Sequence, residues 1–133
     1  MRYPALVAIV DDDEQLLHSV GGLLRSFGIK ALLFHSAEEF LQAAPTAIDC
    51  VIADIHMPGM DGLTMLRKLR AGGSEVPVII LSALDPDSTR DRALASGADA
   101  YFSKPVDTEE LMDRMLRVVN ARNGANGDHA DRP

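Results

Sequence analysis

The sequence contains a single cysteine, Cys50, and no tryptophan. One cysteine excludes an internal disulfide and any cysteine-based metal cluster. It lies in the apolar run 50–53, so we expect a small buried side chain rather than a reactive thiol. Basic residues are also few: 13 Lys and Arg stand against 20 Asp and Glu, which gives a net charge of −7. Such an acidic chain is not expected to bind nucleic acid directly.

Long apolar segments are absent as well. No stretch approaches the ~20 apolar residues that a membrane-spanning helix requires, and the first residues lack the pattern of a secretion signal. We therefore expect a cytoplasmic protein that does not associate with membranes. Apolar residues still make up 47% of the 133 residues, which indicates one folded domain with its own hydrophobic core.

Five short apolar runs alternate with five segments of helical periodicity. The runs cover residues 5–10, 31–34, 50–53, 76–81 and 100–102. The helical segments cover residues 16–27, 36–45, 63–69, 85–97 and 107–119. Strands that are apolar throughout are typical of a parallel sheet covered by helices on both faces. The sequence therefore predicts an α/β fold built as a doubly wound, five-stranded parallel sheet over residues 1–121. Residues 122–133 have no apolar periodicity, and we expect a flexible C-terminal tail or the start of a linker there.

Polar side chains follow four of the five predicted strands. Asp11 and Asp12 come after the first, Asp54 after the third, Ser82 after the fourth and Lys104 after the fifth. Taken singly, each has an ordinary interpretation as a helix cap, a turn residue or a solvated charge. However, ligands of open parallel sheets bind beyond the carboxyl ends of the strands, so we expect these residues to converge at one edge.

This convergence predicts a site for metal-assisted phosphoryl transfer. Carboxylates gathered at one edge repel one another, and a cation between them removes that repulsion. Hard oxygen ligands suit Mg²⁺ or Mn²⁺ better than zinc. A further carboxylate beside the metal can act as a nucleophile toward phosphorus, while a lysine and a hydroxyl bind the oxygens of the transferring group.

Four segments together resemble the receiver domains of bacterial response regulators, namely residues 9–14, 54–62, 82–83 and 101–105. The resemblance covers about residues 6–119 and implies the flavodoxin-like receiver fold, with strand order 2-1-3-4-5 and five helices. It implies a signal-transduction phosphoacceptor of two-component systems, which receives a phosphoryl group from a phosphohistidine and changes conformation to control a partner or output domain. It also implies a switch rather than an enzyme, with at most slow self-catalysed phosphoryl transfer and autodephosphorylation.

The resemblance assigns expected roles to individual residues of the acidic cluster. Asp54 matches the phosphoacceptor. Asp11, Asp12, Asp54 and the backbone carbonyl of His56 match the ligands of Mg²⁺, with Mn²⁺ as an alternative. Asp13 has no required role in the family, and we interpret it as an exposed acid near the first helix.

Other matching residues are expected to detect the phosphoryl group. Ser82 matches the hydroxyl residue that moves toward it, and Tyr101 matches the aromatic residue whose ring then turns inward. Lys104 matches the lysine that pairs with the phosphoryl oxygens. Lys104 and Pro105 also match a pair joined by a cis peptide bond, and X-Pro is the one bond for which cis has a low energetic cost.

The expected partners follow from the same resemblance. The phosphoryl donor is a histidine kinase or a histidine phosphotransfer protein. The output face is formed by the fourth helix, fifth strand and fifth helix, around Arg90, Ala95, Tyr101 and Leu111, and it contacts a downstream partner, an output domain or a second copy of the chain. The sequence does not identify the kinase, the stimulus, or whether the chain stands alone or belongs to a longer regulator.

Two alternatives to this interpretation come from other classes of protein. The first is a receiver-like module that acts by binding alone and is never phosphorylated. The second is a phosphatase of the haloacid-dehalogenase type, which needs a second Asp two residues after its nucleophile, where this chain has His56. The remaining histidines, His18, His35 and His129, show no metal-ligand spacing and are interpreted as surface residues.

Overall fold

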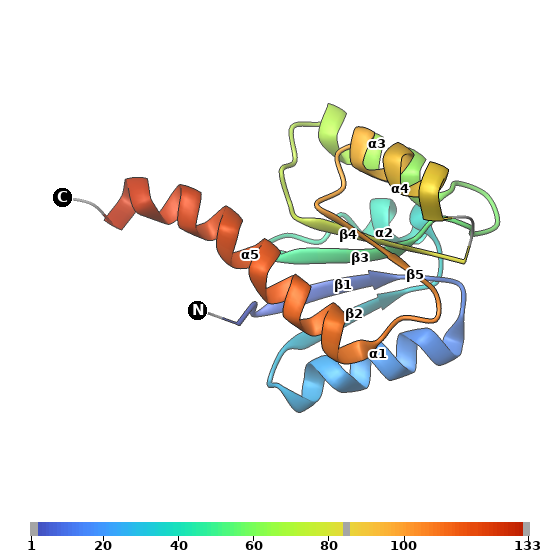
Figure 1. Ribbon diagram of the computed structural model, residues 1–133, viewed down its shortest axis with the longest axis horizontal. Coiled ribbons are helices and arrows are strands. Elements are labelled where there is room, and N and C mark those ends of the chain that lie inside the picture. Colours follow the sequence, from blue (N-terminus) through green and yellow to red (C-terminus); the bar gives the residue numbers. More distant parts are fainter. Residues whose placement is uncertain (1–2, 84–85, 132–133) are drawn as a thin grey trace.

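The computed structural model describes the backbone of residues 3–83 and 86–131 and the side chains of residues 3–83 and 88–121. Its strands are β1 (Leu6–Val10), β2 (Lys30–Phe34), β3 (Cys50–Asp54), β4 (Val78–Ser82) and β5 (Ala100–Ser103). All neighbouring strands are parallel, and their order is β2-β1-β3-β4-β5 (Figure 1). The predicted sheet and its strand order are therefore confirmed.

Five helices cover the two faces of this sheet. They are α1 (Glu14–Ser26), α2 (Ala37–Ala43), α3 (Gly62–Ala71), α4 (Pro86–Ala95) and α5 (Thr108–Asp131). Helices α1 and α5 lie on one face, whereas α2, α3 and α4 lie on the other (Figure 1). In β1, Val7 and Ile9 point toward α1 and α5, while Ala8 and Val10 point toward the opposite helices. Because both faces are buried, every position of such a strand is apolar.

Cys50 is fully buried on the α1 and α5 side and forms no disulfide, as predicted. Burial raises the pKa of its thiol, so the sulfur stays protonated at neutral pH. The cysteine is therefore a small core residue and not a nucleophile.

Polar residues fix the points at which the helices begin. The Asp13 carboxylate accepts hydrogen bonds from the first free backbone N–H groups of α1, and Ser36 and Asp107 do the same for α2 and α5. Each cap satisfies donors that the helix itself leaves without partners. Since Asp13 directly follows Asp11 and Asp12, its cap also fixes the loop that carries those two acids.

The helix α5 continues past the predicted end of the domain. A flexible tail or the start of a linker was expected from Arg122, and the backbone there is helical to Asp131, projecting beyond the sheet in Figure 1. Once packing has nucleated a helix, each added residue gains a backbone hydrogen bond without needing a packed side chain. Although α5 has 24 residues, neither it nor any other helix in the described chain is apolar enough to span a membrane. Residues 132–133 and Asp85, which was expected at the start of α4, lie outside the described residues.

The expected output face also needs a correction. Leu111 was placed on this face, but it is only 1% exposed and packs in the core with Met115. These two residues lie one turn apart on the stripe of α5 that contacts the sheet. Tyr101 is buried as well, whereas Arg90 and Ala95 of α4 are exposed. Of these four positions, the two that are exposed both belong to α4.

Candidate functional site

The carboxyl ends of four strands meet at one edge of the sheet. Asp11 directly follows β1, Asp54 and Ser82 end β3 and β4, and Lys104 directly follows β5. The backbone N–H of Lys104 donates to the carbonyl oxygen of Ser82 at 2.8 Å, which ties the ends of β4 and β5 together. The structure thus brings together residues that lie up to 93 positions apart in the sequence.

Three carboxylates form the centre of this site. Asp11, Asp12 and Asp54 each offer an oxygen atom, and all three oxygens lie within 4.8 Å of one another. Asp11 is fully buried and Asp54 is 6% exposed, whereas Asp12 is open to solvent. Oxygen ligands with one side open to water suit a hard divalent cation such as Mg²⁺. We call these residues the acid trio.

The acid trio is incompletely neutralised by the protein itself. Burial, together with the neighbouring charge of Asp11, raises the pKa of Asp54 to about 6, although Lys104 acts in the opposite direction. Burial also raises the pKa of Asp11, although the N–H of Asp13, which donates to it at 2.9 Å, and Lys104 favour its charged form. A bound cation would complete this neutralisation, so the residues present fit a metal.

Lys104 supplies the positive charge of the site. Its Nζ lies 3.0 Å from Oδ2 of Asp11 and 3.5 Å from Oδ1 of Asp54. Burial by itself lowers the pKa of Lys104, but the two carboxylates outweigh this effect and raise it, so the ammonium group stays charged. The Lys104–Pro105 peptide bond is cis in the structure. The ammonium group therefore lies beside the carboxylate that is expected to accept the phosphoryl group.

Ser82 and Tyr101 are both buried near this edge. Ser82 is fully buried at the end of β4, and the ring of Tyr101 is 4% exposed within the core on the α2, α3 and α4 face. The guanidinium group of Arg90 lies 5.5 Å from the centre of that ring. Among the described residues, the Tyr101 hydroxyl has no hydrogen-bond partner. The ring thus lies inward, inside the core.

The loop between β3 and α3 packs directly against Asp54, and two of its contacts were missed by the sequence analysis. A Cβ atom on Gly62 would lie 2.1 Å from the backbone oxygen of Asp54. Glu38 of α2 accepts the Met60 N–H at 2.9 Å, which lowers the pKa of the Glu38 carboxyl. The glycine was visible in the sequence, but only the tertiary structure shows what it approaches. His56 lies in the same loop, two residues after Asp54, with an exposed side chain.

A groove with a volume of about 520 Å³ opens beside the acid trio. It runs between α1 and the connection from β5 to α5, and its lining includes Leu16, Val20, Lys104, Pro105 and Val106. Lys104 belongs both to the groove and to the charged site. A partner bound in the groove would therefore lie next to Asp54.

Comparison of the sequence with known proteins identifies its relatives. The profile of the response regulator receiver domain family matches residues 7–116. The response regulator protein TmoT of Ectopseudomonas mendocina is 36% identical over 116 residues, which are 86% of this chain and 53% of that protein. The response regulator MprA of Mycolicibacterium vanbaalenii is 37% identical over 117 residues, which are 87% of this chain and 51% of that protein. The chain thus spans about half the length of these relatives.

Solved structures give the same result. A receiver domain of the Francisella response regulator 1452 superposes with a TM-score of 0.83 at 29% identity, covering 89% of this chain and 98% of the other. A BeF3-activated DrrB receiver domain superposes with a TM-score of 0.81 at 30% identity, covering 89% and 99%. With the converging strand ends described above, these matches show that the chain belongs to the response regulator receiver domain family, whose members are phosphoacceptors in signal transduction.

Proposed function

We propose that Asp54 is the residue that accepts the phosphoryl group. The observation that supports this assignment is the position of its carboxylate, which is nearly buried within the acid trio with one oxygen 3.5 Å from the Lys104 ammonium group. Asp11 is already engaged by Lys104 and by the N–H of Asp13. Asp54 is therefore the carboxylate best placed to act on an incoming group.

The reaction transfers one phosphoryl group between proteins. One oxygen of Asp54 attacks the phosphorus atom of a phosphohistidine, the phosphorus–nitrogen bond breaks, and an acyl phosphate forms as the imidazole leaves. Lys104 pairs with the oxygens of the transferring group, and the Ser82 hydroxyl donates a hydrogen bond to one of them. Positioning and charge neutralisation account for most of the catalysis in such transfers. Because the phosphoryl group ends on Asp54 of the chain itself, the proposed function is a switch and not the turnover of a separate substrate.

We assign the divalent cation to the same edge of the sheet. Asp11, Asp12 and Asp54, together with the backbone carbonyl of His56, would hold Mg²⁺ or, as an alternative, Mn²⁺. When bound, the ion supplies positive charge that neutralises the oxygens of the transferring phosphoryl group. The observed spacing of the three carboxylate oxygens, all within 4.8 Å, supports this ligand set.

The phosphoryl donor is proposed to be a histidine kinase or a histidine phosphotransfer protein, the usual donors for response regulators. The groove beside Lys104 supports this choice, because a helical partner seated between α1 and Val106 would present a histidine to Asp54. Leu16 on α1 and Val106 across the groove are half-buried and give it apolar surface suited to packing against such a helix.

The signal is proposed to leave through α4, β5 and α5. Phosphorylation draws Ser82 and Lys104 toward the new charge and holds Tyr101 in its inward position, which shifts the balance between two conformations. The exposed residues of α4, including Arg90, carry this change to a downstream partner, an output domain or a second copy of the chain.

The proposed chemistry is tested by incubating the chain with acetyl phosphate and Mg²⁺ and measuring the intact mass. We expect a gain of about 80 Da, the mass of one phosphoryl group, which is lost in Asp54→Asn and when Mg²⁺ is removed. Asp13→Asn is the matched control, because it removes the same charge from the same edge of the sheet and Asn still caps α1. A gain that persists in Asp54→Asn would contradict the assignment, and no gain in the wild type would favour a module that acts by binding alone.

A further inference from the structure

The loop that joins β3 to α3 carries His56, whose backbone carbonyl is assigned to the divalent cation. The start of the loop is anchored to the sheet, because the Ile55 N–H donates to the Leu81 carbonyl at 3.2 Å. Its end is anchored to α3, because the Asp61 carboxylate accepts the Thr64 N–H at 2.7 Å. The position of the metal ligand therefore depends on what holds the residues between these two anchors.

Glu38 of α2 holds the middle of this loop. Its Oε2 accepts the Met60 N–H at 2.9 Å, although the two residues are 22 positions apart. Within the described chain, this is the one hydrogen bond that joins residues 56–60 to another element. The side chains of Met57 and Met60 pack against the core, the first buried and the second partly buried. The backbone of the loop is thus tied to α2 through one carboxylate.

The Glu38 carboxylate lies directly against the backbone of the loop. A Cβ atom on Gly59 would lie 2.3 Å from Oε2 of Glu38, so any side chain at this position would push the carboxylate away. Gly59 also has a φ of +83°, a conformation that glycine adopts at little cost. The Met60 N–H, and next the N–H of Glu38 itself, lower the pKa of the Glu38 carboxyl, so the acceptor is charged at neutral pH. The tether is therefore a charge-assisted hydrogen bond, which is stronger than one between neutral groups.

We propose that Glu38 is a positioning residue for the divalent cation, because its hold on Met60 keeps the His56 carbonyl in place. This inference rests on the proposed function, in which that carbonyl and the acid trio bind Mg²⁺. Mg²⁺ accepts little deviation from octahedral geometry, so a displaced ligand weakens its binding. Where only a fraction of the molecules has the loop in place, the apparent affinity falls in proportion to that fraction. Glu38 therefore affects the ion without touching it.

Glu38 acts through the loop and not as a ligand of the ion. Among the described residues, the acids whose oxygens lie within 4.8 Å of one another are the acid trio, which does not include Glu38. Its carboxylate is already engaged by the Met60 N–H. A negative charge can still attract a cation from a distance. The contribution of the tether therefore has to be separated from that of the charge.

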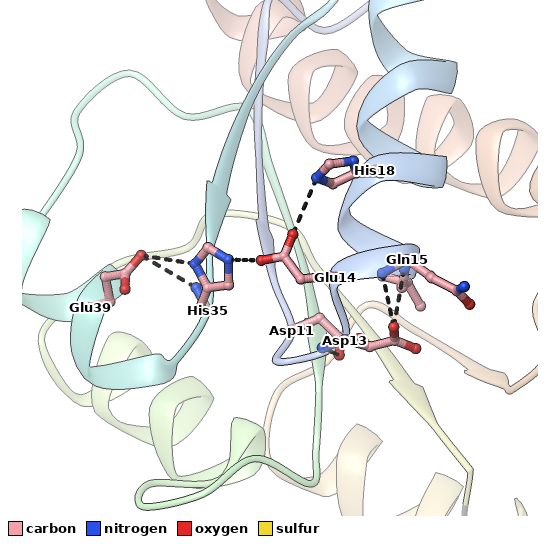
Figure 2. Close-up of polar contacts among 8 residues, drawn as sticks. Asp11, Asp13, Glu14, Gln15, His18, His35 and Glu39 are labelled. Atoms are coloured by element: carbon pink, nitrogen blue, oxygen red, sulfur yellow. Dashed lines mark hydrogen bonds and ion pairs between the residues drawn. The ribbon is translucent and has the colours of Figure 1, made fainter.

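Glu39 provides the matched control for this separation. It follows Glu38 in the first turn of α2 and carries the same charge, and both side chains are exposed. Its Oε1 accepts the His35 N–H at 3.3 Å and lies 3.7 Å from Nδ1 of the same histidine. Figure 2 shows Glu39 directed at His35, which in turn contacts Glu14. Glu39→Gln therefore removes one charge from the same end of α2 and leaves the contact with Met60 in place.

The test is a titration of the isotope-labelled full chain with MgCl₂, followed by the NMR shifts of the backbone amides. We expect the Mg²⁺ affinity to be about three- to tenfold lower in Glu38→Ala, which is the effect of losing one hydrogen bond. Glu38→Gln keeps an oxygen that can accept the Met60 N–H, so its affinity should lie between those of Glu38→Ala and the wild type. Glu39→Gln should bind Mg²⁺ as the wild type does.

Two results would overturn the proposal. One is equal Mg²⁺ affinity in the wild type and Glu38→Ala, even if the variant is less stable, because the contact would then serve the fold alone. The other is an equal loss of affinity in Glu39→Gln, because the charge and not the tether would then be responsible. A wild type that binds no Mg²⁺ would refute the proposed metal site itself, and the role of Glu38 with it. Urea unfolding without Mg²⁺ checks that each variant is folded.

Discussion

The buried carboxylates of Asp11 and Asp54 oppose folding at neutral pH. Both lie where water solvates them poorly, and Lys104 is the one cation that the described ion pairs bring to them. An uncompensated buried charge is destabilising unless a partner or a metal ion neutralises it. The site therefore costs stability in the absence of a divalent cation, and this cost can be measured.

Asp54→Asn is expected to raise the free energy of unfolding at pH 7 without divalent cations. The pKa of Asp54 is raised in the folded chain from 3.8 to about 6, so folding favours its protonated form. The stability that this provides is complete below pH ~4 and is lost as the pH rises through ~6. Asparagine does not ionise, so the variant keeps this stability at all pH values. Its free energy of unfolding should therefore exceed that of the wild type by an amount on the order of 2 kcal/mol above pH ~6, and the two should be equal below pH ~4.

Urea unfolding of both proteins across this pH range measures the difference. Added Mg²⁺ should reduce the difference by stabilising the wild type alone. Asp13→Asn serves as the control, because Asp13 is exposed and asparagine is also a good cap. A variant no more stable than the wild type at pH 7 would contradict the burial argument.

Single residues of the site could be predicted from the sequence where they come at or directly after the end of a predicted strand. Asp11, Asp54, Ser82 and Lys104 each come at or just after an apolar run, and parallel strands must bring their carboxyl ends to one edge. The approach of His18 and His35 to different oxygens of Glu14 was not predictable in this way. It depends on the rotation of α1 and on the register of β1 with β2, which a single sequence does not specify.

Among the connecting elements, the loop from β3 to α3 is the most tightly constrained near the site. Gly62 begins α3, and its N–H donates to the Ile55 carbonyl at 2.9 Å. Its α-carbon lies so close to the backbone of Asp54 that no side chain fits between them. The absence of a side chain at Gly62 thus lets α3 begin directly beside the backbone of Asp54.

Gly62→Ala is expected to destabilise the fold by about 1–3 kcal/mol and to slow phosphorylation by acetyl phosphate. The added methyl group would lie 2.1 Å from the Asp54 backbone oxygen, so either the loop or the strand end must move. Gly22→Ala is the matched control, since Gly22 lies in α1 with nothing within 4 Å of the added carbon. Urea unfolding and intact-mass kinetics measure the two effects. Equal stability of the two variants would disprove the steric argument.

Element positions were largely predictable, and the errors have physical causes. The buried positions of the strands are apolar except for Asp54 and Ser82, the last residues of β3 and β4, and this pattern predicted the strand bounds to within two residues. The helical backbone beyond residue 121 could not be predicted, because a helix can extend beyond the core without an apolar stripe. Leu111 was misplaced because periodicity identifies the apolar stripe of a helix but does not show whether a given member faces the sheet or a partner.

On the scale of the whole molecule, the folded domain is predicted to end near residue 121. The buried residues of α5 in the described chain, from Leu111 to Val119, all precede this point. A chain truncated after Ala121 is therefore expected to unfold in urea with the same free energy, within about 0.5 kcal/mol, as the full chain. A loss of more than about 1 kcal/mol would show that residues 122–133 belong to the domain.

The buried hydroxyl of Tyr101 affects the free-energy balance between the two positions of its ring. Burying the ring is favourable, but a buried hydroxyl without a partner costs about 1–3 kcal/mol, and this oxygen has none among the described residues. The cost of the unpaired hydroxyl therefore offsets part of the gain from burying the ring. A nearly balanced equilibrium responds to a small bias, whereas a deeply biased one needs several kcal/mol to reverse. In the switch that we propose, this unpaired oxygen thus reduces the free energy by which the Tyr101 ring prefers its inward position.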